Sequence, residues 1–179
     1  MVESLPVRDA LPGFRRLSGL TVITLRHLAS DTSARAAVQD QGLPWCEAPG
    51  ELAGAGPWLA WRSPRETLAL GFDATLLPAL LQALAPGRSE SAVAVDLSQA
   101  LAVFELQGAH IDEWLAHLVD ASSIPRQVGR AARCRMMDVA VFLLRLQADR
   151  LLLLVDRPVA AYAEDWLAYA HEGAFAGSA

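Results

Sequence analysis

The sequence predicts an α+β fold in which two related halves pack as one domain. Short alternating apolar segments indicate strands, and apolar residues at helical spacing indicate helices. The same order of elements also recurs after roughly eighty residues. Each half reads β-α-ββ-α, which is close to the ferredoxin-like split β-α-β arrangement with one strand fewer. The halves are predicted over residues 19–88 and 91–171, and together they form a single domain over residues 19–171.

The first half is predicted to contain a strand, a helix, a long irregular segment, a hairpin and a second helix. These elements fall at residues 20–28, 31–39, 43–56, 57–72 and 75–85. The strand is predicted because its β-branched residues alternate with others, and the irregular segment because proline and glycine interrupt it. Asp73 or Thr75 can begin the second helix. Pro78 is awkward if Asp73 is the cap, whereas with Thr75 as the cap it lies in the first turn, where its missing amide is not needed.

The second half repeats this order after a short strand over residues 92–95 that is free to pair with either half. Its strand, helix, irregular segment, hairpin and helix fall at residues 101–107, 110–119, 120–133, 139–155 and 158–169. The first helix has one apolar face at helical spacing, with Asp112 on the opposite face. The last helix is expected to bury Val159, Tyr162, Ala163, Trp166 and Ala170.

Residues 1–18 are predicted to form an extended arm, and residues 172–179 a loose tail. The apolar side chains of Leu5, Leu11 and Phe14 are costly to leave in water, so the arm should lie on another surface. With Trp45 of the long irregular segment, they are candidate contacts with a partner protein. The alternative for Trp45 is that it folds back onto its own domain.

The composition restricts the class of protein. The chain has 179 residues, of which 53% are hydrophobic, and apolar runs such as residues 151–155 are far shorter than a membrane-spanning helix of ~20 residues. The apolar excess predicts a surface that a partner covers, or else reflects a composition rich in alanine and leucine. The net charge of −5 disfavours nucleic-acid binding. The first residues do not resemble a signal peptide, so we expect a cytoplasmic protein.

The residues that could carry chemistry form no recognisable catalytic set. Cys46 and Cys134 are far apart and lie in no CxxC pair, so they are predicted to be structural thiols. His110, Glu113 and His117 share a helix face and could hold a metal, but this face more simply points to solvent. No nucleophile elbow occurs, and we predict neither catalytic residues nor a metal site.

A local cluster of positive charge offers a candidate anion site. Four arginines fall within the second irregular segment and just after it: Arg126, Arg130, Arg133 and Arg135. In an acidic protein such a patch can meet an anionic ligand, such as a polyglutamyl folate tail, or an acidic partner surface. The alternative is that the four side chains are simply solvated.

The segment that opens the second half resembles a known family. Val95-Asp96-Leu97-Ser98 is followed by a strand ending in Leu106-Gln107-Gly108-Ala109 and by a Trp- and Leu-rich helix. This order resembles the folate-binding domain of the glycine-cleavage T protein. The whole chain is most similar to the gamma subunit of heterotetrameric sarcosine oxidase. Further similar features are the segment 129–134, the hairpin 139–155 and the closing Arg157-Pro158 … Tyr162 … Asp165-Trp166-Leu167.

The resemblance implies a folate-binding-domain-like (aminomethyltransferase-type) fold without a catalytic role. It implies membership of a complex that oxidatively demethylates sarcosine to glycine, releases hydrogen peroxide and transfers the one-carbon unit to tetrahydrofolate. FAD, FMN, NAD and tetrahydrofolate would be bound by the larger alpha and beta subunits, with alpha as the direct partner. Gln99 and Ala100 stand where the family often has His or Arg, so Asp96 is interpreted as a structural remnant.

Two other functions remain open at this point. A free-standing folate or anionic-ligand binding module would use the arginine cluster. An independent aminomethyltransferase is the weaker hypothesis, because the chain has about half the expected length and no recognisable catalytic acid.

Overall fold

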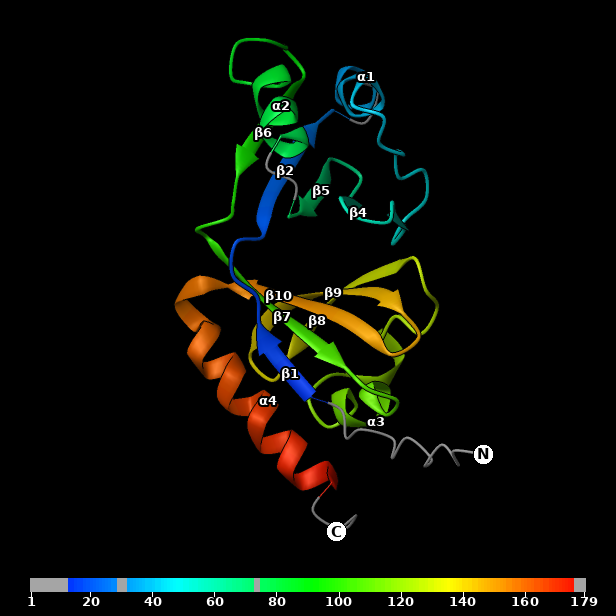
Figure 1. Ribbon diagram of the computed structural model, residues 1–179, viewed down its shortest axis with the longest axis vertical. Coiled ribbons are helices and arrows are strands. Elements are labelled where there is room, and N and C mark those ends of the chain that lie inside the picture. The colour runs from blue at the N-terminus through cyan, green and yellow to red at the C-terminus, as the bar shows by residue number, and fades with distance from the viewer. Residues whose placement is uncertain (1–12, 29–31, 73–74, 176–179) are drawn as a thin grey trace, which may run out of the picture.

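The computed structural model describes residues 13–28, 32–72 and 75–175 and shows four layers. Two five-stranded sheets pack face to face, and helices cover the outer face of each (Figure 1). In this arrangement each sheet buries one face against the other sheet and one face against helices, which is why most strands are apolar on both faces.

The first sheet has the order β3-β4-β5-β2-β6 and carries the helices α1 and α2. Its elements are β2 (Thr21–His27), α1 (Ser33–Asp40), β3 (Leu52–Ala53), β4 (Trp58–Ser63), β5 (Glu66–Gly71), α2 (Leu76–Ala83) and β6 (Ala92–Asp96). The second sheet has the order β1-β7-β10-β9-β8 and carries α3 and α4. Its elements are β1 (Gly13–Arg16), β7 (Leu101–Gln107), α3 (Ile111–Leu115), β8 (Arg130–Met136), β9 (Val139–Gln147), β10 (Arg150–Asp156) and α4 (Ala160–Phe175). Short 3₁₀ turns lie at Ala121–Ser123 and Arg157–Val159.

The two halves exchange their outermost strands. β1 precedes the first half in the chain but pairs with β7 of the second half, from Gly13↔Gln107 to Arg16↔Phe104. β6 directly precedes the second half but pairs with β2 of the first half, from Ile23↔Asp96 to His27↔Ala92. The predicted strand 92–95 therefore pairs with the first half. Each sheet is completed by a strand that lies, along the chain, next to the other half.

Three apolar cores follow from the layers. The central core lies between the sheets and includes Val22, Leu70, Val103, Phe142 and Leu154. The outer core of the second sheet is the largest, and it includes Phe104, Trp114, Met136, Leu153 and Leu167. The outer core of the first sheet packs α1 and α2 against β2 and β5.

The predicted β-α-ββ-α order is incomplete, because each half has three strands after its first helix. β3 lies inside the predicted irregular segment 43–56, and β8 begins inside the predicted irregular segment 120–133. The ferredoxin-like description is not confirmed. Every strand pairing in the described residues is antiparallel, so β7 and β9, the strands of the predicted unit on either side of α3, run parallel with β10 between them. What the prediction lacks is β8, an additional strand that follows α3 and pairs with β9 at the edge of the sheet.

The ends of several elements also differ from the prediction. α3 stops at Leu115 rather than residue 119, although Leu118 and Val119 remain buried as predicted. α4 continues to Phe175, so the predicted loose tail begins as helix, and residues 176–179 lie outside the described part. The last part of the predicted arm is strand β1 of the second sheet. The hairpins β4–β5 and β9–β10 are confirmed.

Candidate binding surfaces

The Asp96-Leu97-Ser98 motif forms a turn at the end of β6. The Ser98 backbone N–H and hydroxyl both donate to Asp96 Oδ1, at 2.8 and 2.6 Å. Ser98 Oγ in turn accepts a hydrogen bond of 3.0 Å from the Val22 N–H in β2. The Asp96 carboxylate is therefore committed to its own backbone turn, as Asp commonly is at such sites. This agrees with its interpretation as a structural residue.

The second family motif lies against the same turn. The Arg157 guanidinium donates to the carbonyls of Ser98, Gln99 and Leu101, at 2.9, 2.6 and 3.1 Å. Arg157 thus fixes the connection through which the chain passes from β6 in one sheet to β7 in the other. The two motifs that carry the resemblance stabilise the crossing of the halves and leave no free reactive group in this turn.

Three of the four predicted arginines lie together. Arg126, Arg130 and Arg133 line an open hollow of about 560 Å³ between β8 and the segment 121–127. Arg130 also donates to the Pro49 carbonyl at 3.1 Å. Arg135 is not part of this hollow and donates to the Asp138 carbonyl at 2.6 Å. Three of the predicted arginines thus share one open basic surface, and its use as an anion site stays a prediction.

Buried Arg145 of β9 holds this surface in place. Its Nε donates to the Pro125 carbonyl at 2.8 Å, its Nη1 donates to the Ala148 carbonyl at 3.1 Å, and its Nη2 forms an ion pair with Asp112. Asp112 is predicted on the helix face opposite the apolar one, whereas the structure pairs it with Arg145. Sequence patterns did not reveal this contact, because its partners are distant along the chain.

The predicted partner contacts in the described residues pack within the chain. Phe14 lies against the outer core of the second sheet, with its ring 5.7 Å from Trp114 and 6.3 Å from Phe104. Trp45 packs against the first sheet's outer core, 5.3 Å from the His27 ring. Both partly buried rings thus pack onto their own domain, as the alternative for Trp45 expected, and their contact with a partner protein stays a prediction. Leu5 and Leu11 lie outside the described residues.

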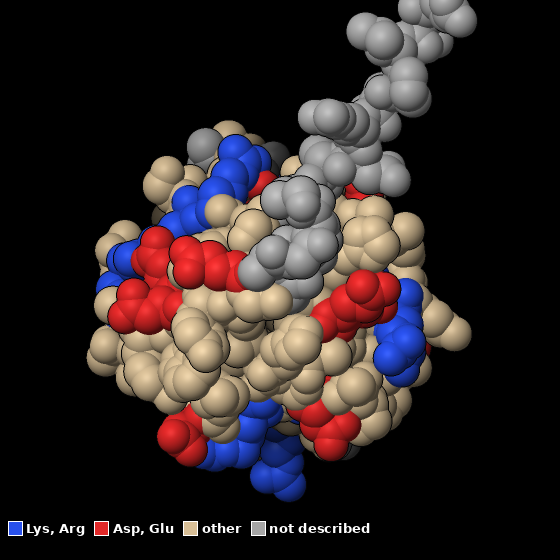
Figure 2. All heavy atoms as spheres, turned by 90° about the horizontal axis from the view of Figure 1, so that it is seen from below, with Lys and Arg blue, Asp and Glu red and all other residues tan. Residues whose placement is uncertain are grey.

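An aromatic stripe on α4 is the most distinctive exposed apolar feature. Tyr162, Trp166 and Tyr169 stack edge to face along the helix, with ring centroids 6.2 and 5.7 Å apart. Tyr162 is 38% exposed and Tyr169 70% exposed, so the prediction that Tyr162 is buried is wrong. The acidic residues Asp165 and Glu172 are also exposed on this helix. Figure 2, which views the molecule from the side of α3 and α4, shows acidic side chains separated by uncharged surface.

Neither cysteine is prepared for thiolate chemistry. Burial raises the pKa of Cys46 and of Cys134 to about 11, so both thiols stay protonated near neutral pH. Cys46 donates to the Leu59 carbonyl at 3.1 Å, as expected of a structural thiol. His110 lies 3.4 Å from Glu113, but the described residues contain no group of three side chains placed to hold a metal. No helix among them is long and apolar enough to cross a membrane.

Comparison with solved structures identifies the fold. The chain superposes on a chain of heterotetrameric sarcosine oxidase from Corynebacterium sp. U-96 with a TM-score of 0.79 and 26% identity. The match covers 90% of this chain and 84% of that chain. It also superposes on the glycine cleavage system aminomethyltransferase T from Bartonella henselae with a TM-score of 0.62 and 12% identity, spanning only 46% of that protein. No protein-family model matches the sequence, and no curated protein matches it.

The α-β-β-α sandwich is thus a fold of the folate-binding-domain-like, aminomethyltransferase type. Within this class, the chain is similar to a chain of heterotetrameric sarcosine oxidase over most of both lengths, and the resemblance predicted from the sequence is confirmed.

Proposed function

We propose that this chain is the small, non-catalytic gamma subunit of a sarcosine-oxidase-type flavoenzyme complex. The complex oxidatively demethylates sarcosine to glycine, releases hydrogen peroxide and passes the one-carbon unit to tetrahydrofolate. FAD, FMN, NAD and tetrahydrofolate are bound by the larger alpha and beta subunits, and the assembly is cytoplasmic. The observation that carries the proposal is the match to a sarcosine oxidase chain of similar length, because both chains are covered almost fully.

The described residues support an accessory role. The Asp96–Ser98 turn and Arg157, which carry the family resemblance, form hydrogen bonds that stabilise the connection between the two sheets. The thiols of Cys46 and Cys134 are protonated near neutral pH.

The aromatic stripe of α4 is the proposed contact with the alpha subunit. Tyrosine and tryptophan supply large contact area and are enriched at the energetic centres of interfaces. Asp165 and Glu172 on the same helix call for a partner surface that bears arginine, which can pair with carboxylates and stack on rings. A second copy of this chain is disfavoured as the occupant, because each copy carries a net charge of −5.

Co-expression tests the assignment to the complex. The chain should co-purify with the alpha and beta subunits of a heterotetrameric sarcosine oxidase and should be required for a soluble, active assembly. The measurements are size-exclusion chromatography and sarcosine-dependent peroxide release. An assembly that forms and turns over equally well without this chain, and never retains it, would reject the proposed function.

Paired variants test the docking surface separately. Changing Tyr162 and Tyr169 to serine should weaken retention by the large subunits at least about tenfold, since interface aromatics often contribute 2 kcal/mol or more. The control is Phe72→Ser, which alters a 55% exposed ring directly after β5 in the other half. If the large subunits retain the tyrosine variant as well as they retain Phe72→Ser, the α4 surface is not the contact, and the subunit assignment still stands.

The basic hollow supports one alternative function, a free-standing module that binds folate or another anionic ligand. In that case the isolated chain should bind tetrahydrofolate with micromolar affinity, measured by calorimetry. Arg126→Gln should abolish binding, because this exposed arginine lines the hollow. Absence of heat in the unmodified chain decides against the module.

A further inference from the structure

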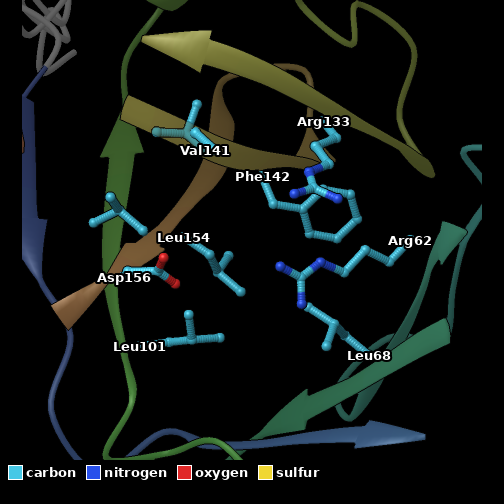
Figure 3. A pocket seen from close by; sticks show the side chains of 10 residues that line it. Arg62, Leu68, Leu101, Arg133, Val141, Phe142, Leu154 and Asp156 are labelled. Atoms are coloured by element: carbon cyan, nitrogen blue, oxygen red, sulfur yellow. The ribbon is translucent and has the colours of Figure 1, made fainter. Parts of the chain in front are cut away.

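A second, smaller pocket lies between the two sheets and shares only Arg133 with the basic hollow. It has a volume of about 50 Å³, and residues from both sheets line it, among them Arg62, Arg133, Phe142 and Asp156 (Figure 3). A water molecule needs about 10–15 Å³ by this measure, so the pocket has room for about four water-sized groups. That is the size of a small carboxylic acid or of the end of an acidic side chain.

Arg62 presents an unused donor here. Its Nη1 lies 3.1 Å from Glu66 Oε1, and Glu66 also accepts a hydrogen bond from Thr24. Its Nε is buried and has no hydrogen-bond partner among the described residues. A buried donor without an acceptor is unfavourable, so the site is incomplete as it stands. Since Glu66 occupies Nη1, the edge formed by Nε and Nη2 remains open, and this edge matches the two oxygens of a carboxylate.

Arg133 supplies a second positive charge from the opposite sheet. Figure 3 shows its guanidinium directed into the same pocket as that of Arg62, beside the ring of Phe142. No ion pair to Arg133 is found among the described residues. Two guanidinium groups that converge on one space repel each other, and an anion between them removes that repulsion.

Asp156 defines which anion fits. Its carboxylate also lines the pocket, but it forms no ion pair with Arg62 or Arg133 within the part of the chain described. A carboxylate in the lining disfavours ligands with two negative charges. The pocket therefore suits a monoanion with a carboxylate fork better than phosphate.

We propose that the inter-sheet pocket binds a carboxylate, held between Arg62 of β4 and Arg133 of β8. The carboxylate comes either from a free acid of about acetate size or from an acidic side chain of a partner subunit. The site belongs to this chain and does not depend on the proposed function. It also differs from the basic hollow, whose other arginines, Arg126 and Arg130, do not line the pocket.

Nuclear magnetic resonance of the arginine Nε–H groups tests the site in the full chain, with sodium acetate as the probe at constant ionic strength. The Arg62 Nε–H signal should shift in a saturable way at millimolar acetate and should respond much less to inorganic phosphate. Arg133→Gln should weaken the response about tenfold, as loss of one charge-assisted hydrogen bond does. Arg135→Gln, on the same strand as Arg133 but outside both the pocket and the hollow, is the matched control and should leave it unchanged.

The outcomes separate the two sources. If a partner side chain fills the pocket, the Arg62 signal is already shifted in the assembled complex and no longer responds to acetate. If a free acid fills it, the response persists in the complex. The proposal is overturned if acetate gives no saturable shift in the chain alone, as when Arg62 binds only a water molecule. It is also overturned if Arg133→Gln responds to acetate as the unmodified protein does.

Discussion

The two halves of the molecule share one topology but fix it differently. Both sheets place an exchanged strand next to the half's first strand, and the remaining strands follow in the same order. In the described part of the first half, the buried polar side chains are Thr24 and Thr67, which are uncharged. In the second half they are Glu105 and Arg145, which are both ionised and paired.

This difference shows where charge is used in the fold. Arg145 connects the sheet to α3 and to the segment 121–127, and Glu105 connects the exchanged strand β1 to β7 and β10. The first half has no such charged tether among its buried residues and depends on the packing of α1 and α2. The two halves therefore share their strand order. Among the residues that the structure describes, only in the second half do buried charged residues, Glu105 and Arg145, hold neighbouring segments in place.

The largest expected effect comes from the apolar cores that both halves possess. Trp114 is fully buried in the second half and donates from Nε1 to the Leu167 carbonyl at 3.2 Å. Trp114→Ala should lower the free energy of unfolding by about 4–5 kcal/mol, because it leaves a large cavity. The counterpart in the first half is Leu80→Ala, which should cost about 3 kcal/mol. Urea unfolding followed by circular dichroism measures both.

The exchanged strands add a second expectation to that pair. β1 and β6 each link one half to the sheet of the other half, so neither half can unfold without disturbing the other. Each of the two variants should therefore unfold in a single transition. Separate transitions for the two halves in either variant would contradict the coupling. If Leu80→Ala lowered the free energy of unfolding more than Trp114→Ala, the outer core of the second sheet would not be the one that contributes more.

An intermediate effect is expected from the charged tether. Arg145→Met removes one member of a buried pair and leaves Asp112 and the Pro125 carbonyl without their donor, which should cost about 3 kcal/mol. The matched change in the first half is Thr24→Val, which removes a single 2.9 Å hydrogen bond to Glu66 and should cost about 1 kcal/mol. Denaturant midpoints compare them. If both variants lose the same stability, charge is not what distinguishes the halves.

Much of the fold was accessible from the sequence, because local periodicity carried it. The strand β2, both hairpins and the start of α2 after Thr75 each have a clear pattern within a short window. β8 was missed because four of its seven residues are Arg or Cys, which hides the alternation of its apolar positions. The exchange of β1 and β6 was not predictable in full, since pairing partners lie about ninety residues apart for β1 and are chosen by tertiary packing.

Candidate sites were likewise predictable where their residues are close in sequence and not where they come from distant segments. The basic hollow was predicted because Arg126, Arg130 and Arg133 are close in sequence. The inter-sheet pocket was missed because Arg62 and Arg133 come from different halves, although a charge inside the apolar strand β4 was a usable signal. The spacing of Tyr162 and Tyr169 places both on one helix face, and only the packing of α4 shows that this face is outside.

A smaller effect than that of Arg145→Met is expected for the tether on β1. Glu105, with a side chain 2% exposed, accepts hydrogen bonds of 2.6 Å from Arg15 and from Arg150. Burial alone would raise the pKa of Glu105, but these two hydrogen bonds outweigh it and hold the pKa below its usual 4.5. Since Arg15 is 72% exposed, water screens its share. Glu105→Gln should therefore cost only about 1–2 kcal/mol at neutral pH.

The sign of the pH dependence distinguishes this tether from simple packing. A carboxyl group whose pKa is lowered by folding stabilises the protein fully above its unfolded pKa, near 4.5, and loses this contribution as the pH falls through the folded pKa. The stability difference between the unmodified protein and Glu105→Gln should thus shrink steadily below about pH 4.5. The exposed pair His110–Glu113 provides the control, Glu113→Gln, which should change little at neutral pH.

Hydrogen exchange should also be faster at the backbone amides of β1 in Glu105→Gln but not at those of β6, because the first half holds its exchanged strand without a buried charge. Equal protection of the two strands in this variant would show that Glu105 does not act as the tether.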